Sequence, residues 1–255
     1  FFINIANAPP GDYYYDSVLA HEFQHMIHWN VDQNEESWMN EGLSELAALL
    51  NGYGPSDWTS TFLVNPDLQL TGWPEDGAGA NYGAAFLFTT YFLDRFGQDA
   101  LRALVANPLN GLAGVDDTLE QIGAGVSADD VFADWVVANL INDPGVSSSQ
   151  YAYTSLLDLF PVAVTGTVAA YPFETDWQQV HQYGADYIQI IPPGEVTLRF
   201  EGASQVRILS TDTHDTDDNA STEDRFVWWS NRGDDSNMTL THAVDLSGVA
   251  DAILE

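Results

Sequence analysis

The sequence predicts an α+β protein that is mainly helical over residues 1–160 and rich in β-structure over residues 161–255. In the first part, apolar residues recur at helical spacing. In the second part, short β-branched and aromatic runs alternate with Pro, Gly and Asp clusters. The chain is 45% hydrophobic and contains eight Trp, so it can bury a sizeable core. We therefore expect a helical domain followed by an antiparallel β-sandwich-like domain, with the boundary near residue 160.

Helical spacing marks four segments of the first part, which are residues 16–29, 43–50, 82–96 and 131–140. Gly97 is expected to end the third helix. Residues 51–80 are rich in Gly, Pro, Trp and Thr, which predicts a long, partly ordered connection. In the second part, the expected strands are residues 162–168, 187–191, 196–200, 206–209, 226–229 and 238–240.

The charge of the chain is strongly acidic, with 38 Asp plus Glu against 6 Lys plus Arg and a formal net charge of −32. A nucleic-acid partner is excluded, because such proteins place several cations on the phosphates. Docking on anionic lipid is disfavoured for the same reason. The longest apolar run, residues 83–93, is too short to cross a bilayer, so we expect no membrane insertion.

The chain contains no Cys, which excludes disulfides, thiol catalysis and Cys-ligated zinc. It begins at Phe1, and no signal peptide is visible. We therefore expect a processed form or an excised piece of a longer protein.

The strongest chemical signal is an H-E-x-x-H motif formed by His21, Glu22 and His25. On a helix, residues four apart share a face, so both imidazoles can bind one metal ion. Glu22 can then take a proton from a water bound to that metal. A hydrolytic Zn²⁺ site needs a third protein ligand and one open position. The alternative is an ordinary solvated face of an amphipathic helix.

The apolar stripe of that helix consists of Leu19, Phe23 and Met26, and we expect it to lie opposite the motif. His28 lies one turn beyond His25, too far along the axis to join the same ion. We expect His28 to be a polar residue at the rim.

A second motif, W-M-N-E-G-L-S-E at residues 38–45, resembles the N-E-x-x-S-[DE] segment of the gluzincin metallopeptidases. The resemblance implies that Glu41 is the third zinc ligand and that Glu45 orients His21, with Asn40 assisting in the same way. The alternative for both glutamates is a solvated helix face. Only 15 residues separate His25 from Glu41, fewer than in thermolysin-like relatives. Over residues 14–50 the chain is most similar to the hyicolysin-type branch.

Residues 81–88 are similar to a helix of gluzincin aminopeptidases that begins with a catalytic Tyr, although the Lys of that family pattern is absent. The similarity implies that Tyr82 donates a hydrogen bond to the oxyanion. The alternative is a structural Tyr at a helix start, and His181 is the other candidate donor.

The acidic run at residues 211–224 is either a Ca²⁺ site or a solvated acidic loop, because it lacks the EF-hand spacing. Residues 228–238 resemble the β-domain of immune inhibitor A-type secreted metallopeptidases. That resemblance implies a secreted or cell-surface protein, whose β-domain is expected to be truncated at the C-terminus.

Together these motifs predict a zinc-dependent endopeptidase with a zincin-like catalytic domain that acts on protein or peptide substrates. Zincins usually carry a β-sheet before the active-site helix, whereas only residues 1–5 are available here for a strand. A non-catalytic zinc-binding surface or adhesion module with a degenerate site is therefore one alternative. An aminopeptidase is another, and it would need an upstream acidic residue to bind the substrate amine.

Overall fold

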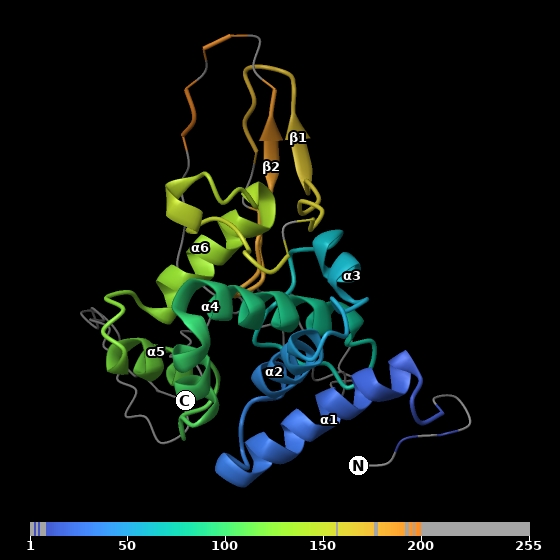
Figure 1. The fold of residues 1–255 in the computed structure, drawn as a ribbon. Coiled ribbons are helices and arrows are strands. Elements are labelled where there is room, and N and C mark those ends of the chain that lie inside the picture. The colour runs from blue at the N-terminus through green and yellow to red at the C-terminus, as the bar shows by residue number, and fades with distance from the viewer. Residues whose placement is uncertain are drawn as a thin grey trace, which may run out of the picture. The chain divides into compact units, whose positions relative to one another are not determined.

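The computed structural model describes residues 3, 5, 9–156, 158–175, 178–191, 194–195 and 197–199. About 50% of the described residues are helical, and two short strands pair in parallel. The elements in chain order are α1 (Tyr13–Val31), α2 (Ser37–Leu50), α3 (Thr59–Leu63), α4 (Gly79–Val105), α5 (Gly111–Gln121), α6 (Ala128–Ile141), the 3-10 turn η1 (Ser147–Ser149), β1 (Gly166–Val168) and β2 (Ile188–Ile190) (Figure 1). The chain divides into two compact units, residues 1–196 and 197–255, and all these elements belong to the first.

The four helices predicted from apolar spacing are confirmed as α1, α2, α4 and α6. Local caps begin two of them: the Asp12 carboxylate accepts the Tyr14 N–H at 2.9 Å, and Ser127 forms a capping box with Asp130. The long connection contains the short helix α3.

Apolar spacing did not predict α5, and no local side-chain cap marks its N-terminus. The Glu35 carboxylate, from the distant connection between α1 and α2, accepts the Gly111 N–H at 2.7 Å instead.

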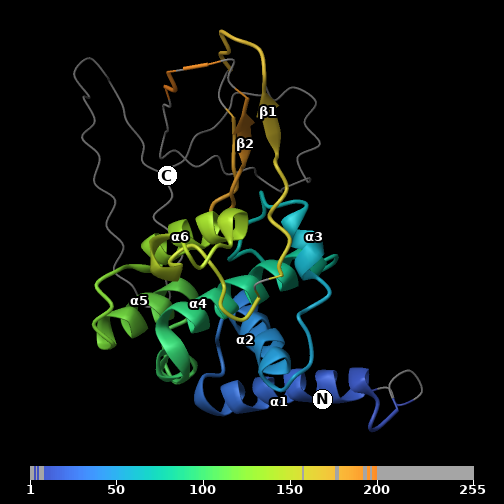
Figure 2. The ribbon, with the colours of Figure 1, turned by 45° about the horizontal axis from the view of Figure 1, so that its top comes forward.

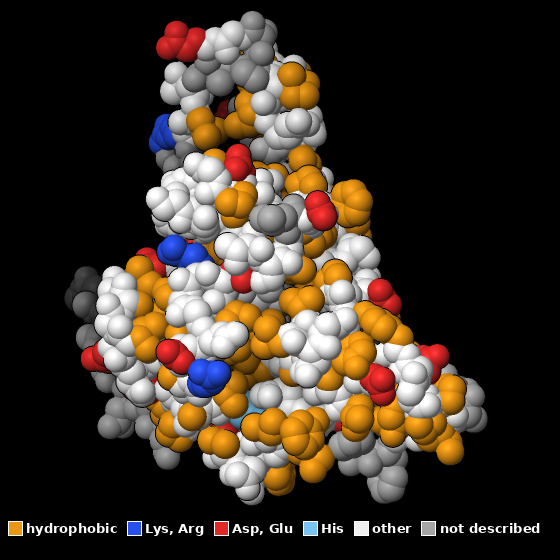
Figure 3. All heavy atoms as spheres, viewed as in Figure 1, with side chains coloured by type: hydrophobic (Ala, Val, Ile, Leu, Met, Phe, Trp, Pro, Cys, Tyr) orange, Lys and Arg blue, Asp and Glu red, His pale blue; other side chains and the backbone are white. Residues whose placement is uncertain are grey.

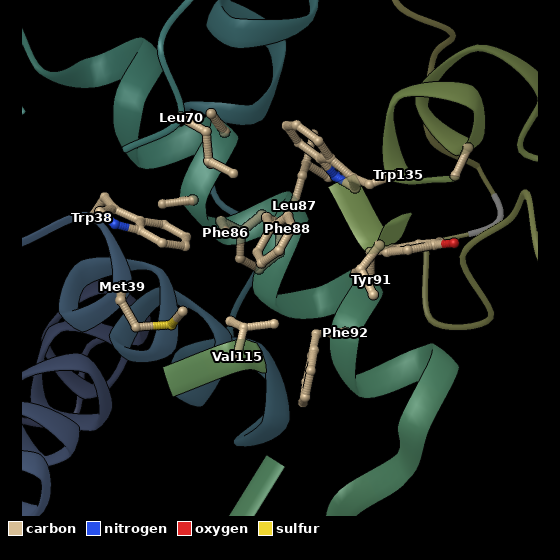
Figure 4. Close-up of a cluster of buried hydrophobic side chains, with 14 of the residues drawn as sticks. Trp38, Met39, Leu70, Phe86, Leu87, Phe88, Tyr91, Phe92, Val115 and Trp135 are labelled. Atoms are coloured by element: carbon tan, nitrogen blue, oxygen red, sulfur yellow. The ribbon is translucent and has the colours of Figure 1, made fainter. Parts of the chain in front are cut away.

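The core is built around α4, whose residues from Gly83 to Leu93 are all buried. Figure 4 shows side chains from four helices meeting there, with Trp38 from α2, Val115 from α5 and Trp135 from α6 arranged around the Phe and Leu residues of α4. Phe88 meets Trp38 and Trp135 edge-on, at centroid distances of 5.6 Å and 5.7 Å. Burying one such side chain contributes about 1.5–3 kcal/mol, so this cluster fixes the position of α4.

Gly97 interrupts α4 where the sequence predicts a helix end, because its φ of 83° and ψ of 175° are not helical. Glycine adopts such a positive φ readily, and a second helical segment of α4 follows the kink and runs to Val105. Apolar residues of this second segment, including Ala100 and Leu104, are buried in the same core.

Helix α2 lies between α1 and α4 in both views of the ribbon (Figures 1 and 2), and it packs on each of them. Its contact with α4 is closest at Gly42, where an added Cβ would stand 2.7 Å from the carbonyl oxygen of Ala85. The Thr89 hydroxyl donates to the Gly42 carbonyl at 2.9 Å across the same contact. The backbone that carries Glu41 is therefore held directly against the core.

The apolar stripe of α1 is exposed: Leu19, Phe23 and Met26 are 39%, 55% and 53% exposed. Figure 3 shows hydrophobic side chains gathered along the edge of the molecule where α1 lies. The motif face of α1 packs on α2 instead. The sequence identified the two faces of this helix correctly, but it did not show which face meets the rest of the unit.

The strands β1 and β2 pair in parallel, with Gly166 opposite Ile188, so the antiparallel pairing that we expect is wrong for this pair. Parallel strands need a crossover of a dozen or more residues, and residues 169–187 provide one. These strands adjoin the helical core, because the Val162 N–H donates to Asn139 O at 3.0 Å and the Tyr187 hydroxyl donates to Val136 O at 2.8 Å. The first compact unit accordingly extends beyond the expected boundary at residue 160.

The remaining expected strands lie outside the described residues, apart from residues 197–199, which are in no strand. Among the described helices, none combines the length and apolar character that crossing a membrane requires.

Candidate metal centre

Helices α1 and α2 bring three side chains to one point. His21 and His25 stand one turn apart on α1, and their Nε2 atoms are 3.0 Å from each other. The Glu41 Oε2 atom from α2 lies 3.2 Å from Nε2 of His21 and 3.4 Å from Nε2 of His25. The three side chains are 16%, 23% and 21% exposed, so the cluster is shielded and still reachable from solvent.

The other nitrogen of each imidazole meets an oxygen acceptor. Nδ1 of His21 lies 3.1 Å from Oε1 of Glu45, and Nδ1 of His25 lies 3.0 Å from Oδ1 of Asn40. In the neutral rings these acceptors hold the proton on Nδ1, which directs both Nε2 lone pairs at the cluster. Sequence analysis placed Glu45 and Asn40 in such roles, and the structure puts them there. It did not include Ser44, whose hydroxyl lies 3.1 Å from Nδ1 of His25.

The three converging atoms fit a bound Zn²⁺ ion. Ligand atoms of a tetrahedral zinc ion with Zn–N bonds of about 2.0–2.1 Å lie about 3.3–3.4 Å apart, close to the three separations found here. The Nε2 lone pairs of the two imidazoles and the Glu41 carboxylate converge on one point, where they repel one another unless a cation lies between them. The Glu41 Oε2 atom is also buried, which is costly for a carboxylate unless a cation or a protonated imidazole pairs with it.

Without an ion, a proton takes the place of that cation. Burial alone would lower the pKa of His21, but the hydrogen bonds and charges of Glu41 and Glu45 outweigh it and raise that pKa to about 9. Burial alone would raise the pKa of Glu41, but the two imidazoles outweigh it and lower that pKa to about 2. A metal ion entering the cluster at neutral pH therefore displaces a proton.

Tyr82 lies beside the cluster, in the first turn of α4. Its ring centroid is 6.5 Å from that of His21 and 4.9 Å from that of Trp73, which it meets edge-on. Burial, followed by the charge of Glu41, raises the pKa of the Tyr82 phenol well above its usual range. The phenol therefore keeps its proton and is available as a hydrogen-bond donor.

Glu22 is half-buried on α1, and its charge also raises the pKa of Tyr82. The Glu22 carboxylate therefore lies close enough to the phenol of Tyr82 for its charge to act on it. His181, the other candidate donor, is 64% exposed, and its Nδ1 lies 3.1 Å from Oδ1 of Asp67. Of the two candidates, Tyr82 is the one in ring contact with the cluster.

His28 differs from the expectation of a rim residue, because it is only 1% exposed. The helix argument correctly kept it out of the first cluster, but the connection that follows α1 covers it. The acidic run at residues 211–224 and the segment at residues 228–238 lie outside the described residues.

No protein-family model matches the chain, and no curated protein is significantly similar to it. What can be said of its chemistry rests on the residues and their geometry.

Proposed function

We propose that this chain is a zinc-dependent peptidase of the gluzincin type, most simply a secreted or cell-surface endopeptidase. One observation carries the proposal: Nε2 of His21, Nε2 of His25 and Oε2 of Glu41 converge, while a fixed acceptor holds the other nitrogen of each ring. This donor set, with two imidazoles and one carboxylate, is the set of thermolysin-type hydrolytic zinc sites.

The residues around the cluster supply the remaining chemistry. A zinc ion held by these ligands supplies Lewis acidity, which polarises a carbonyl group and acidifies water. Glu22 accepts a proton from the attacking water and passes it to the amine that leaves when the peptide bond breaks. The protonated phenol of Tyr82 donates a hydrogen bond to the oxygen that becomes negative during the attack.

The proposal includes a finer description of the fold. Helices α1, α2 and α4 correspond to the helical part of a zincin-like catalytic domain, with the ligands on the first two and Tyr82 on the third. The residues after the first compact unit, from residue 197 on, which the sequence predicts to be β-rich, form the accessory sandwich-like domain, and the run at residues 211–224 is its candidate Ca²⁺ site.

The substitution Glu22→Gln tests the function, because it removes the proton acceptor and leaves the three ligands in place. We expect the variant to retain zinc, measured by mass spectrometry of the metal, while casein hydrolysis falls by a factor of at least about 100. The matched control is Glu75→Gln, at an exposed position, which should hydrolyse casein like the parent chain. Turnover that persists in Glu22→Gln would refute the mechanism.

A second candidate function, a zinc-binding module without catalysis, is favoured by the exposed apolar stripe of α1. In that case the parent chain would bind stoichiometric zinc and leave casein intact, with or without a chelator. Hydrolysis that the chelator abolishes would exclude this candidate. Peptides with a blocked N-terminus separate the remaining alternative, because an aminopeptidase would not cleave them.

A further inference from the structure

A second group of potential ligands surrounds the connection between α1 and α2. His28 is in the last turn of α1, Asp32 is the residue that caps its C-terminus, and Glu35 follows three residues later. Each offers one ligand atom, and these atoms all lie within 4.8 Å of one another. The group is more buried than the first cluster: the side chains of His28 and Glu35 are 1% and 4% exposed, and Asp32 is 7% exposed.

Polar atoms in this group lack partners. Neither ring nitrogen of His28 makes a hydrogen bond of normal geometry, although the Asn40 side chain lies close enough to interact with the ring. Oδ2 of Asp32 has no partner either, and all three atoms are buried. In a neutral imidazole one ring nitrogen is a hydrogen-bond donor and the other is an acceptor. In either tautomer, the His28 ring therefore leaves at least one of these two nitrogens without a hydrogen bond. Buried groups of this kind are rare in folded proteins and call for a ligand.

In each of the two carboxylates, one oxygen accepts hydrogen bonds from backbone N–H groups. Oδ1 of Asp32 accepts the Asn34 N–H at 3.1 Å. Oε1 of Glu35 accepts the N–H groups of Glu36 and Gly111, at 2.6 Å and 2.7 Å. Backbone donors thus fix the orientation of each carboxylate through one oxygen, which leaves the second oxygen available to a ligand.

The distance between Oε2 of Glu35 and Nε2 of His28 suits a metal ion as that ligand. Oε2 of Glu35 lies 3.9 Å from Nε2 of His28, too long for a hydrogen bond. Two ligand atoms of one metal ion, with bonds of about 2.0–2.2 Å, lie about 3–3.6 Å apart at octahedral or tetrahedral angles and about 4–4.4 Å apart on opposite sides of the ion. The separation of 3.9 Å falls within the span of these values, and the ligand atoms of all three residues lie within 4.8 Å of one another.

We propose that His28, Asp32 and Glu35 bind a second divalent transition-metal ion, such as Zn²⁺ or Mn²⁺, in a structural site separate from the first cluster. One imidazole and two carboxylates suit these ions, whereas Ca²⁺ takes oxygen ligands. The ion neutralises two buried carboxylates and gives His28 the partner that it lacks.

The position of this site gives it a role. It spans the connection that joins the helix bearing His21 and His25 to the helix bearing Glu41. A metal bound there fixes where α2 begins relative to the end of α1. It thereby stabilises the short connection that brings the first three ligands together.

The competing state is metal-free, with a proton on the carboxylate. Burial raises the pKa of Glu35 to about 7, so a protonated Glu35 would also reduce the buried charge. Metal retention distinguishes the two states, because a protonated cluster retains no ion.

The test removes the first cluster and measures what remains. A chain carrying His21→Ala, His25→Ala and Glu41→Ala is stripped with a chelator, equilibrated with Zn²⁺ or Mn²⁺, and passed through gel filtration in excess Mg²⁺ to clear ions held by surface carboxylates. We expect it to retain about one equivalent of Zn²⁺ or Mn²⁺. Adding Asp32→Asn and Glu35→Gln should abolish this retention. Adding Glu75→Gln and Asp76→Asn instead, at exposed positions, should leave it unchanged.

The proposal is overturned if the triple variant, folded by circular dichroism, retains no metal, or if Asp32→Asn with Glu35→Gln leaves retention unchanged. Retention of Ca²⁺ in preference to both transition metals would also overturn it. Should the triple variant not fold, the parent chain decides by stoichiometry, with about two equivalents expected and about one contradicting the second site. Because activity is not measured, this result is independent of the proposed peptidase function.

Discussion

Glu45 offers a sharp test of how the candidate zinc site works, because it acts on the metal only through His21. Its Oε1 lies 3.1 Å from Nδ1 of His21, while Nε2 of the same ring faces the cluster. Replacing Glu45 with Ala removes the acceptor that holds the ring orientation and makes the imidazole a stronger ligand. Losses of this kind weaken metal binding by about 10–100-fold. At about 1.4 kcal/mol per tenfold change, this corresponds to about 1.4–2.8 kcal/mol of binding free energy.

The zinc dissociation constant of each variant is measured by competition with a chromophoric chelator at fixed pH. Glu45→Gln should lie between the parent chain and Glu45→Ala, because the amide oxygen still accepts a hydrogen bond and only the charge is lost. Glu120→Ala, at an exposed position of α5, is the control and should bind like the parent. A Glu45→Ala variant with unchanged zinc affinity would show that the contact with His21 does not support the site.

Three further outcomes are expected. Phe88→Ala should lower the free energy of unfolding by about 3–5 kcal/mol in urea denaturation, because Phe88 is fully buried; a loss below about 1 kcal/mol would contradict the packing described. Burial raises the pKa values of Tyr91 and Tyr187 in the folded chain. The stability that the two protonated phenols contribute is therefore present below a pH of about 10 and is lost above it. The loss amounts to up to roughly 1.4 kcal/mol per pH unit for each phenol. Denaturation at pH values of about 9 and 11 measures this, and equal stability at both would contradict it. Chelation should increase amide hydrogen exchange in α1 more than in α4, because α1 has one apolar face exposed and the bound metal would link it to α2. Equal increases in the two helices would argue against a metal that links α1 to α2.

The sequence alone was sufficient where a local pattern decides the structure. Apolar spacing predicted four helices, and the spacing of His21 and His25 predicted that their rings share a face. Glu41 was identified by resemblance, and the fold places its carboxylate within 3.4 Å of both rings. The helices and the shared face of His21 and His25 depend on the geometry of single helices, which a short stretch of sequence determines, whereas Glu41 needed the family pattern.

Features that depend on distant partners were not predictable. Apolar spacing defines the stripe that contains Phe23 without showing whether another element covers it. Helix α5 begins where Glu35 accepts its first N–H, so its start signal lies 76 residues away in the sequence. His28 was judged only by its distance from His25 along one helix, whereas its burial comes from the connection to α2. Each miss therefore involves a contact between segments that no local pattern encodes.

The close approach at Gly42 has a consequence for how substitutions in this chain would be interpreted. Any side chain at this position would collide with the backbone of Ala85, so most replacements there would push α2, and with it Glu41, away from α4 and out of its position beside α1. A survey of variants scored by activity would rank position 42 with the metal ligands, although glycine has no atom that binds a metal. A parallel survey scored by the amount of folded protein would separate them, because replacing His21 spares the fold and replacing Gly42 does not. Intolerance to mutation in this helix thus reports two different requirements, one for chemistry and one for space.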